Sequence, residues 1–313
     1  MIKTLKNILN SEKFETLSAE ALSVNPWVTP EFIATAREAI VQEFLDENKL
    51  KHFCLEHNID TTPKDKRAAI ICAGNLPLVG FGDLFYTLLC GWKILLKPSS
   101  KDPLMRLFED IEGVEIIESI ENLDTADAII LMGSDKTCAL IEELYPSIPK
   151  LLRGSMHSIA ILPTEPSTGD VEGLYKDIFL YCSKGCRSVS HLYIPRGFDV
   201  ERLAHILKDT HLSSGYALPK IWHERYTYER ATSMLRGDRI IDCGFCLLRE
   251  AEHHSPTQSL TTITFSYFDN PEEIPDTQIQ HIATSENFGR AQYPTLSDFA
   301  NKESVTEFLG IRL

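Results

Sequence analysis

The stretch RAAIICAGNLPLVGFGDLFYTLLCGWKILLKPSS, residues 67–100, decides the fold. Its apolar run over 68–73 ends in a Gly-Asn turn, which is the pattern of a short buried strand. Residues 76–90 then have helical character up to a glycine, and a second apolar run over 93–97 stops at Pro98. A strand, a helix and a strand in this order predict a parallel βαβ unit with both strands buried.

Outward from this unit, strands and helices keep alternating along the chain. The expected strands are 114–117, 126–132, 158–162, 189–195, 240–248 and 261–268. The expected helices are 103–112, 136–144, 170–182, 199–209 and 222–236. Nearer the N-terminus, Thr29 is expected to cap a helix that begins at Pro30. Such alternation is typical of an α/β protein with a doubly wound parallel sheet.

The chain is long enough for two domains. Its 313 residues exceed the roughly 100–200 residues that one domain usually takes. We expect one α/β domain over residues 1–155, a second, smaller one over 156–290, and a C-terminal tail over 291–313.

The composition excludes several classes of protein. With 45 acidic and 31 basic residues, the net charge is −14, and a surface of that sign repels nucleic acid. No apolar stretch approaches the roughly 18–20 residues that a membrane span needs. Eight cysteines in a chain of this length fit free thiols in a reducing cytoplasm, which is the location we expect.

Cys186 is the candidate nucleophile. It lies between Gly185 and Arg187, just before the expected strand over 189–195. A neighbouring guanidinium favours the thiolate, which is the nucleophilic form of cysteine. The alternative is a buried structural cysteine, the commoner case for a single cysteine. The spacing alone leaves both interpretations open.

Polar or small residues follow other strands at the point where a parallel sheet presents them to a ligand. Asn75 can donate to an oxygen that gains negative charge in a transition state, or it is only a turn residue. Lys97 can reach a ribose or a phosphate, or it is an ordinary solvated lysine. Gly133 and Ser134 end a further strand. In open α/β sheets, ligands bind outside the carboxyl ends of the strands.

The sequence gives no reason to expect a metal site. Cys243 and Cys246 have the two-residue gap of a zinc site, but no second pair of ligands is suitably spaced. Both lie in an apolar run, so we expect them to be core residues of a strand. His253 and His254 form a pair in a polar loop, where we expect no metal.

Several of these stretches together resemble one protein superfamily. AGNLPL over 73–78 and GWKILLKPS over 91–99 resemble, in that order, two motifs of the aldehyde dehydrogenases. Residues 133–134 and 185–187 stand where that superfamily has a cofactor-contacting turn and its nucleophilic cysteine. The closer resemblance is to the LuxC-type acyl-CoA reductases, through AGNLPLVGFGD, GCRSVSHLYIP and YPTLSDFA, and it covers most of residues 25–310.

The resemblance implies a role for each of these residues. Cys186 would attack a thioester carbonyl and form an acyl-enzyme, with Asn75 and the Cys186 backbone N–H as the oxyanion hole. A nicotinamide cofactor would then deliver hydride and release an aldehyde. The first domain, 1–155, would bind this dinucleotide, and the second, 156–290, would carry the nucleophile. The cofactor-binding residues that the resemblance implies are Lys97, Ser99, Gly133 and Ser134.

Two departures from the superfamily bear on the reaction and on the cofactor. Where hydrolytic members carry a glutamate that activates water, this chain has Arg153, which stays protonated and cannot act as a general base. This favours reduction of a thioester over its hydrolysis. Where NAD-preferring members have a glutamate for the ribose hydroxyls, the chain has Ser100, which favours NADPH and leaves NADH as the alternative. Asp102, two residues on, argues against that preference.

The function expected from these residues is NAD(P)H-dependent reduction of an acyl thioester, from acyl-CoA or an acyl carrier, to an aldehyde. Two alternatives stay open: reduction of an acyl phosphate, as in glutamyl-phosphate reductase, and a non-catalytic nucleotide-binding scaffold on the same fold. His157 is a candidate proton donor, or a structural residue at the entrance of a strand. The resemblance also implies a homodimer, and the sequence does not reveal the length of the acyl chain.

Overall fold

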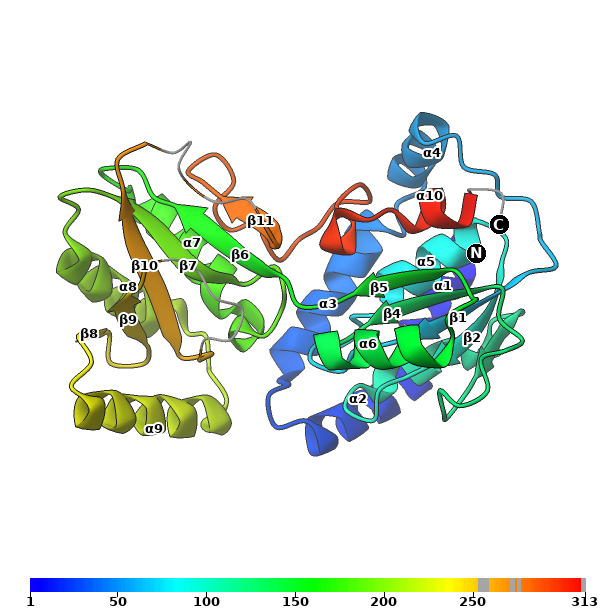
Figure 1. The fold of residues 1–313 in the computed structure, drawn as a ribbon, viewed down its shortest axis with the longest axis horizontal. Coiled ribbons are helices and arrows are strands. Elements are labelled where there is room, and N and C mark those ends of the chain that lie inside the picture. Colours follow the sequence, from blue (N-terminus) through cyan, green and yellow to red (C-terminus); the bar gives the residue numbers. More distant parts are fainter. Residues whose placement is uncertain (253–258, 271–273, 275–276, 311–313) are drawn as a thin grey trace. The chain divides into compact units, whose positions relative to one another are not determined.

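A computed structural model describes residues 1–252, 259–270, 274 and 277–310. The chain divides into unit 1, made of Met1–Ser155 and Pro294–Leu313, and unit 2, made of Met156–Tyr293. Each unit has its own β-sheet with helices packed on it (Figure 1). The α/β fold class predicted from the sequence is therefore confirmed. His253 and His254 lie outside the described residues.

Unit 1 is built on a parallel sheet, sheet A, with the strand order β3-β2-β1-β4-β5. Its strands are β1 (Arg67–Ile71), β2 (Lys93–Lys97), β3 (Val114–Ile116), β4 (Ala128–Met132) and β5 (Lys150–Arg153). All adjacent strands pair in parallel, and β2 has the predicted range. In this order the direction of winding reverses between β1 and β4, which is where doubly wound sheets bind ligands.

The helices of unit 1 come largely from the N-terminal third of the chain. They are α1 (Ile2–Ile8), α2 (Glu12–Val24), α3 (Pro30–Glu43), α4 (Glu47–Glu56), α5 (Phe81–Leu89), α6 (Asp135–Leu144), α10 (Val305–Gly310) and the 3₁₀ helices η1 (Pro103–Asp110) and η4 (Ala300–Lys302). The predicted cap of α3 is confirmed, because the Thr29 hydroxyl accepts a hydrogen bond from the Phe32 N–H at 3.3 Å.

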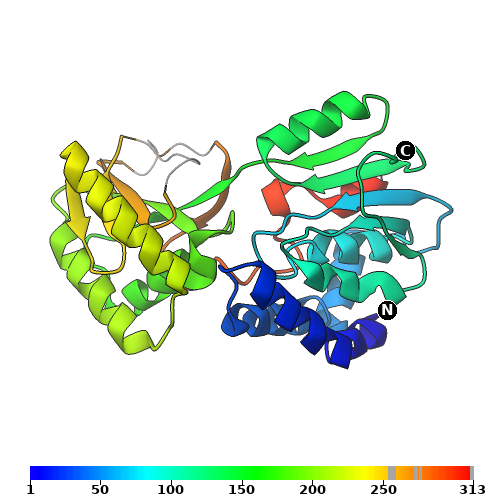
Figure 2. The ribbon, with the colours of Figure 1, turned by 90° about the horizontal axis from the view of Figure 1, so that it is seen from below.

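Alternate residues of sheet A face two separate hydrophobic cores. Ala68 and Ile70 of β1 pack with apolar residues of α1 to α5, whereas Ala69 and Ile71 pack with Ile141 of α6. Figure 2 shows α6 on one side of the sheet and the N-terminal helices on the other. Because both faces are buried, the strands are nearly continuous apolar runs, which is why the sequence reveals them.

The C-terminal segment completes unit 1. The sequence predicts a tail over 291–313, and residues from Pro294 onward instead belong to unit 1. The Tyr86 hydroxyl donates to the Leu296 carbonyl at 2.7 Å, and the Leu296 N–H donates to the Glu43 carboxylate at 3.1 Å. Leu309 of α10 is buried in the same core as α5.

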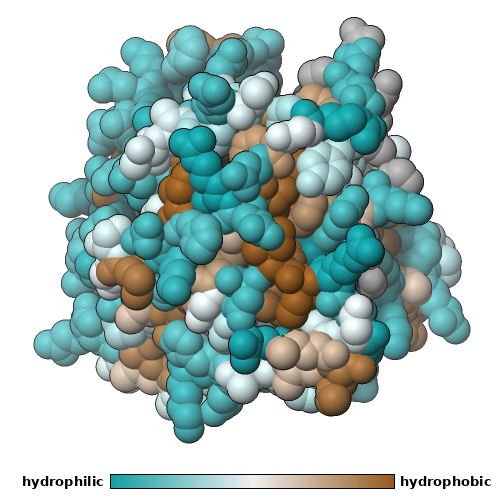
Figure 3. Space-filling view, turned by 90° about the vertical axis from the view of Figure 1, so that its left-hand side faces the viewer, coloured by the Kyte–Doolittle hydropathy of each residue, from teal (hydrophilic) through white to brown (hydrophobic). Residues whose placement is uncertain are grey.

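Unit 2 contains sheet B, with the strand order β11-β6-β7-β10-β9-β8. Its strands are β6 (His157–Ile161), β7 (Val189–Pro195), β8 (Ile240–Asp242), β9 (Leu247–Glu250), β10 (Thr262–Phe268) and β11 (Ile279–Ala283), and its helices are α7 (Thr168–Phe179), η2 (Leu180–Ser183), α8 (Val200–Ser214) and α9 (Lys220–Arg236). Only the β8–β9 pair of the described strands is antiparallel. On the face shown in Figure 3, hydrophobic residues gather in a central strip with hydrophilic residues around it.

Several element boundaries differ from the sequence prediction. The helix predicted over 76–90 begins only at Phe81, because Leu78 has a positive φ of 58° that no helix accommodates. The strand predicted over 240–248 is a hairpin, β8 and β9, whose turn contains Cys243 and Cys246. Both cysteines are buried, so their assignment to the core is confirmed although they are not in a strand. No helix among the described residues is long and apolar enough to cross a membrane.

Arg153, at the end of β5, is a structural residue of unit 1. Its side chain is 1% exposed and forms an ion pair with Asp83 of α5, which is also buried. Its guanidinium also donates to the Glu303 carbonyl at 2.8 Å. Arg153 thus fastens β5, α5 and the C-terminal segment to one another, and this explains an arginine at the position where the sequence comparison expects a glutamate.

We predict that Arg153→Met lowers the free energy of unfolding by about 3–5 kcal/mol, because the Asp83 carboxylate is left buried without its partner. Urea denaturation measures the effect. Arg196→Gln is the matched control: it removes an arginine from the exposed pair with Asp269, and such pairs contribute about 0–1 kcal/mol. Equal losses in the two variants would contradict this role of Arg153.

Candidate active site

The residues predicted to bind a cofactor lie at one edge of sheet A. Asn75 follows β1, Lys97 ends β2 and is followed by Ser99, and Gly133 and Ser134 follow β4. Because β1 pairs in parallel with both β2 and β4, the carboxyl ends of these strands are neighbours. The structure therefore brings the predicted residues to the edge at which this kind of sheet binds ligands.

The loops after β1 and β2 touch each other at a glycine. A Cβ atom added to Gly74 would lie 2.1 Å from the Ser99 hydroxyl oxygen and 2.6 Å from the Ser99 Cβ. Real atoms do not approach so closely, so a larger residue at position 74 would push the two loops apart. Gly74 is thus required for the close contact between the Asn75 loop and the Lys97–Ser99 loop.

Two buried polar side chains hold these loops in place. Asp102, which is 2% exposed, accepts a hydrogen bond from the Leu78 N–H at 2.9 Å. Asn25, which is 4% exposed, donates to the Gly74 carbonyl at 3.2 Å and to the Lys101 carbonyl at 3.3 Å. Leu78 is left-handed, a conformation that costs about 1–2 kcal/mol. The contact with Asp102 helps to hold that strained loop.

Asp102 differs in role from what its position in the sequence suggests. The sequence raises it as a second carboxylate for a ribose, but the side chain points into unit 1 and binds the protein backbone. Burial raises the pKa of Asp102 to about 7, although backbone N–H groups, that of Leu78 first, lower it. Ser100, by contrast, is exposed, and Lys97 is half-buried with its ammonium group 3.3 Å from the Pro98 carbonyl.

The turn after β4 leads directly into α6. The Ser134 hydroxyl caps this helix by accepting from the Thr137 N–H at 3.3 Å. In the first turn, the Asp135 carboxylate accepts from the Ser155 N–H at 2.8 Å. A carboxylate at the helix N-terminus repels a phosphate, so this turn suits an uncharged, hydroxyl-bearing part of a dinucleotide such as a ribose.

In unit 2, Cys186 lies in the turn between η2 and β7. Its thiol is half-buried, and together with His157 and Thr262 it lines a cavity of about 160 Å³. Pockets that enclose a whole small molecule usually measure about 300–1,000 Å³. The cavity at Cys186 is therefore sized for the reacting end of a substrate, with the buried His157 imidazole in its wall.

The backbone just before Cys186 is strained. Tyr181, Cys182 and Ser183 have φ values of 63°, 53° and 53°, and each left-handed residue costs about 1–2 kcal/mol. The Ser183 hydroxyl secures this turn by donating to the Ile178 carbonyl at 2.8 Å, and the Cys182 side chain is fully buried. Strain of this kind persists where surrounding contacts enforce it, and it is concentrated at functional sites.

Side chains on both sides of Cys186 fix the turn. The Ser158 hydroxyl of β6 donates to the Cys186 carbonyl at 2.8 Å, at a point where the register between β6 and β7 shifts. The Gln292 amide donates to the Ser188 hydroxyl at 3.0 Å and to the Asp177 carbonyl at 3.4 Å. Through these bonds, a strand, a helix and a distant loop hold the backbone of the turn that carries Cys186.

Asp177 anchors that distant loop. Its carboxylate accepts from the N–H groups of Gly289 and Ala291 at 2.7 and 2.9 Å. Burial raises the pKa of this fully buried side chain to about 6. Asp177 lies in a helix that the sequence does predict, but nothing in the sequence indicates its contacts more than a hundred residues away.

Sequence reasoning finds polar residues at the carboxyl edge of sheet A and the cysteine at the small cavity, and it misses the residues that hold their loops in place. Ser158, Gln292 and Asn25 carry no motif, and only their partners, which are distant in the chain, reveal their function. The proposed pairing of Asn75 with Cys186 in an oxyanion hole joins residues of different units and stays a prediction.

Comparisons with known proteins identify the fold. No protein-family model matches the sequence, and no curated protein matches it significantly. Among solved structures, an aldehyde dehydrogenase of Mycobacterium tuberculosis, complexed with NAD⁺, matches with a TM-score of 0.62 at 14% identity, over 90% of this chain and 75% of that one. The fold is that of the aldehyde dehydrogenases.

Other aldehyde dehydrogenases agree with this result. The enzyme of Bacillus cereus, in its NAD⁺ complex, matches with a TM-score of 0.61 at 14% identity, over 86% of this chain and 72% of that one. Aldehyde dehydrogenase C of Pseudomonas syringae, a cysteine-to-alanine variant with NAD⁺ and octanal, matches with a TM-score of 0.54 at 14% identity, over 71% of this chain. This chain spans 62% of that protein. Identities this low establish the fold and leave the reaction to be argued from the residues.

We predict a characteristic pH dependence of stability from Asp102. Because its pKa is raised from 3.8 to about 7 on folding, the folded protein retains a proton that the unfolded chain has released between these values. Stability therefore falls as pH rises from about 4 to 7, by at most about 1.4 kcal/mol per pH unit. In Asp102→Asn this contribution is absent, and unfolding free energies measured across that range show a smaller fall.

Asp269→Asn is the control for this measurement. Asp269 is exposed, and its hydrogen bond with Arg196 lowers its pKa, so this carboxylate cannot cause a loss of stability with rising pH. The fall between pH 4 and 7 should persist in Asp269→Asn. An equally steep fall in Asp102→Asn and in the unmodified protein would contradict the assignment.

Proposed function

We propose that this protein reduces an acyl thioester, from acyl-CoA or an acyl carrier, to an aldehyde, with NADPH as the reductant. The observation that carries the proposal is the setting of Cys186: a half-buried thiol at a small cavity, directly after a strained turn. The aldehyde dehydrogenase fold supports it, and so does the sequence resemblance to the LuxC-type acyl-CoA reductases.

In the proposed reaction, the Cys186 thiolate attacks the thioester carbonyl carbon. The tetrahedral adduct then collapses, the carrier thiolate leaves with the bonding electron pair and takes a proton from solvent, and Cys186 keeps the acyl group. A reduced nicotinamide supplies a hydride to the acyl carbon. Collapse of that second adduct breaks the bond to the Cys186 sulfur and releases the aldehyde. Ser158 orients the reacting residue by holding its carbonyl oxygen.

The residues at the carboxyl edge of sheet A fit a dinucleotide. Lys97 offers an ammonium group, and Ser99 and Ser134 offer hydroxyls. The carboxylate of Asp135 leaves the α6 terminus suited to a ribose. Gly74 allows the loops after β1 and β2 to approach each other closely.

Reduction is favoured over hydrolysis because of Arg153. In the place of a water-activating glutamate stands a guanidinium that is buried and paired with Asp83, and a guanidinium cannot accept a proton at neutral pH. At this position the chain therefore offers no general base that could activate a water molecule for attack on an acyl group. The homodimer and the cytoplasmic location remain predictions from the sequence.

We predict that Cys186→Ala folds normally and lowers the rate of acyl-CoA reduction by at least about a thousandfold, because the covalent step is lost. Intact-mass measurement without reduced nicotinamide should show an added acyl group on the unmodified protein and none on the variant. Cys54→Ser, which alters another half-buried free cysteine, should keep both properties. Full turnover by Cys186→Ala would overturn the mechanism.

The same measurement separates the two alternatives. A protein that accepts acyl from an acyl phosphate but not from acyl-CoA is a phosphate-ester reductase. A nucleotide-binding scaffold takes up acyl from neither, yet NADPH still raises its melting temperature, since a ligand at a hundredfold excess over Kd stabilises the folded state by about 2.7 kcal/mol.

We predict that Ser100→Glu shifts the cofactor preference toward NADH. The exposed carboxylate would repel the 2′-phosphate of NADPH and accept hydrogen bonds from the ribose hydroxyls of NADH. The ratio of kcat/KM for NADPH to that for NADH should fall at least about tenfold, which corresponds to about 1.4 kcal/mol. Ser100→Gln, similar in size and uncharged, is the control. An unchanged ratio in Ser100→Glu would place the adenosine ribose elsewhere.

A further inference from the structure

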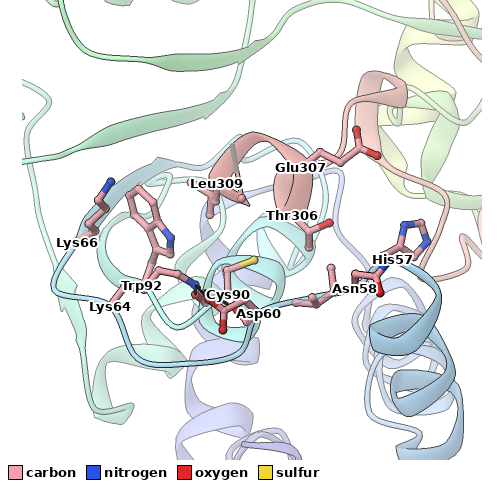
Figure 4. A pocket seen from close by; sticks show the side chains of 12 residues that line it. His57, Asn58, Asp60, Lys64, Lys66, Cys90, Trp92, Thr306, Glu307 and Leu309 are labelled. Carbon is pink, nitrogen blue, oxygen red and sulfur yellow. Dashed lines mark hydrogen bonds and ion pairs between the residues drawn. The ribbon is translucent and has the colours of Figure 1, made fainter. Parts of the chain in front are cut away.

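Unit 1 has a cavity at the edge of sheet A opposite to the candidate cofactor site. It measures about 710 Å³ and lies where β1 and β2 begin, just after Lys66 and Trp92. Its walls come from the loop between α4 and β1, from the turn between α5 and β2, and from α10 (Figure 4). The volume lies within the range of about 300–1,000 Å³ that is usual for small-molecule sites.

Backbone contacts hold the walls of this cavity together. The Lys64 N–H donates to the Gly91 carbonyl at 2.8 Å, and the Lys93 N–H donates to the Lys66 carbonyl at 2.9 Å. Gly91 has a φ of +75°, and a Cβ on it would lie 2.1 Å from the Thr62 carbonyl oxygen. The loop and the turn are therefore packed directly against each other.

A buried hydrogen-bond donor in this cavity lacks an acceptor. The Trp92 side chain is 3% exposed, and its Nε1 has no hydrogen-bond partner among the residues that the structure describes. Figure 4 shows this nitrogen turned toward the space between Cys90 and Leu309. A buried indole N–H usually has a partner, as that of Trp222 has in the Phe245 carbonyl at 2.8 Å. The unmet donor of Trp92 therefore marks a place for an acceptor that a ligand brings.

The lysines and carboxylates that line the cavity are equal in number. Lys64 and Lys66 carry two positive charges, and the carboxylates of Asp60 and Glu307 carry two negative ones. The Lys64 ammonium is paired with Asp60 at 3.3 Å, and the Lys66 ammonium is engaged with the Trp92 ring, 5.4 Å from its centroid. Glu307 points away from Trp92 (Figure 4). Because an ion loses its water at a cost unless it is paired, this balanced lining favours an uncharged ligand.

Other groups around the cavity are apolar or uncharged. Ile59 and the buried Leu309 both line it. Burial raises the pKa of the Cys90 thiol to about 11, so the thiol keeps its proton at neutral pH. At the other end, His57 has a buried Nε2 that also has no partner within the described part of the chain (Figure 4). A ligand therefore meets apolar side chains next to an unmet N–H donor.

We propose that this cavity binds an uncharged molecule with an apolar body and a carbonyl oxygen, such as a carboxamide. The carbonyl oxygen accepts the Trp92 indole N–H, and the apolar body lies along Ile59 and Leu309. A carbonyl oxygen is the acceptor with which buried N–H groups are most often paired in folded proteins. It completes the hydrogen bonding of Trp92 without adding a charge to the balanced lining. The site does not depend on the proposed reaction at Cys186.

NMR spectroscopy on the full chain with ¹⁵N-labelled tryptophan tests this contact directly, and phenylacetamide is the probe. The three tryptophans give three indole N–H signals, which Trp27→Phe and Trp222→Phe assign by the signal that each removes. Phenylacetamide should move the Trp92 proton downfield in a saturable way, because a hydrogen bond deshields the proton of its donor. The Trp222 signal is the internal control and should stay in place, since its N–H is already bonded.

Trp92→Phe keeps most of the ring and removes the donor. Isothermal titration calorimetry should show that this variant binds phenylacetamide about three- to tenfold more weakly than the unmodified protein, as for a hydrogen bond between uncharged groups. Its affinity for ethylbenzene, which has no acceptor, should stay within about twofold. Trp222→Phe, the matched control, should bind both probes as the unmodified protein does.

Two charged probes of similar size test the preference for an uncharged ligand. Phenylacetate, an anion, and phenylethylamine, a cation, should each bind at least about fivefold more weakly than phenylacetamide, because the lining has no excess of the opposite charge. An ion that binds as tightly as the amide would overturn the proposal.

Two other results would also overturn it. One is a Trp92 signal that stays in place up to the solubility limit of phenylacetamide, a measurement that does not require Trp92→Phe to fold. The other is an equal loss of affinity for phenylacetamide and ethylbenzene in Trp92→Phe. Acyl capture on Cys186 is measured separately with acyl-CoA, so failure of either proposal leaves the other untouched.

Discussion

The parallel pairing of β1 with β2 on one side and β4 on the other is the constraint on which the cofactor edge depends. Parallel strands end on the same side of a sheet, so loops that are far apart in the sequence begin next to one another. Asn75, Lys97 and Ser134 need no direct contact to lie at the same edge of the sheet, because the hydrogen bonds between the strands set their spacing. The chain then adds only local contacts: Gly74 lets two loops touch, and Asp102 and Asn25 hold them.

Unit 2 positions its candidate nucleophile in a different way. Cys186 does not stand at the end of a strand but precedes one, after a turn that is costly by itself. Such a turn needs compensation from tertiary contacts, and Ser158, Ser183 and Gln292 provide hydrogen bonds around it. A relaxed loop would leave the thiol with several orientations. A turn held by a strand, a helix and a distant loop keeps the Cys186 backbone in place, and a fixed position favours attack on a carbonyl.

Whether a feature of the fold can be predicted from the sequence depends on how far apart in the chain its interacting residues lie. The β2 strand and the Thr29 cap depend on neighbouring residues, and both are predicted correctly. The start of α5 is predicted too early because the left-handed Leu78 is held by Asp102, a contact that local pattern does not contain. Arg153 stands where the resemblance expects a water-activating glutamate, so the sequence suggests an altered active-site residue. Only its contact with Asp83 shows that it stabilises unit 1.

Missed strands have the same physical explanation. β5 and β11 are short and alternate in burial or polarity, so neither produces the continuous apolar run that marks a strand buried on both faces. The prediction of one strand over residues 240–248, where the structure has the hairpin of β8 and β9, fails for the opposite reason. Its turn contains Cys243 and Cys246, which are both buried, and the sequence pattern of an apolar turn between two short strands is the same as that of one longer strand.

Buried polar atoms at both edges of sheet A lack hydrogen-bond partners among the described residues. At the carboxyl edge, Asn25 donates to the Gly74 carbonyl and one oxygen of Asp102 accepts from the Leu78 N–H, but Asp102 Oδ1 has no partner among these residues. At the amino edge, the Trp92 indole N–H has none among the described residues, and an unmet buried donor costs about 1–3 kcal/mol. A phenylalanine would fill most of the same space without that cost, as the contrast with the paired indole of Trp222 makes clear. Packing alone therefore does not account for a tryptophan at position 92, whereas the Lys66 ammonium over its ring does, because an indole attracts a cation more strongly than a phenyl ring.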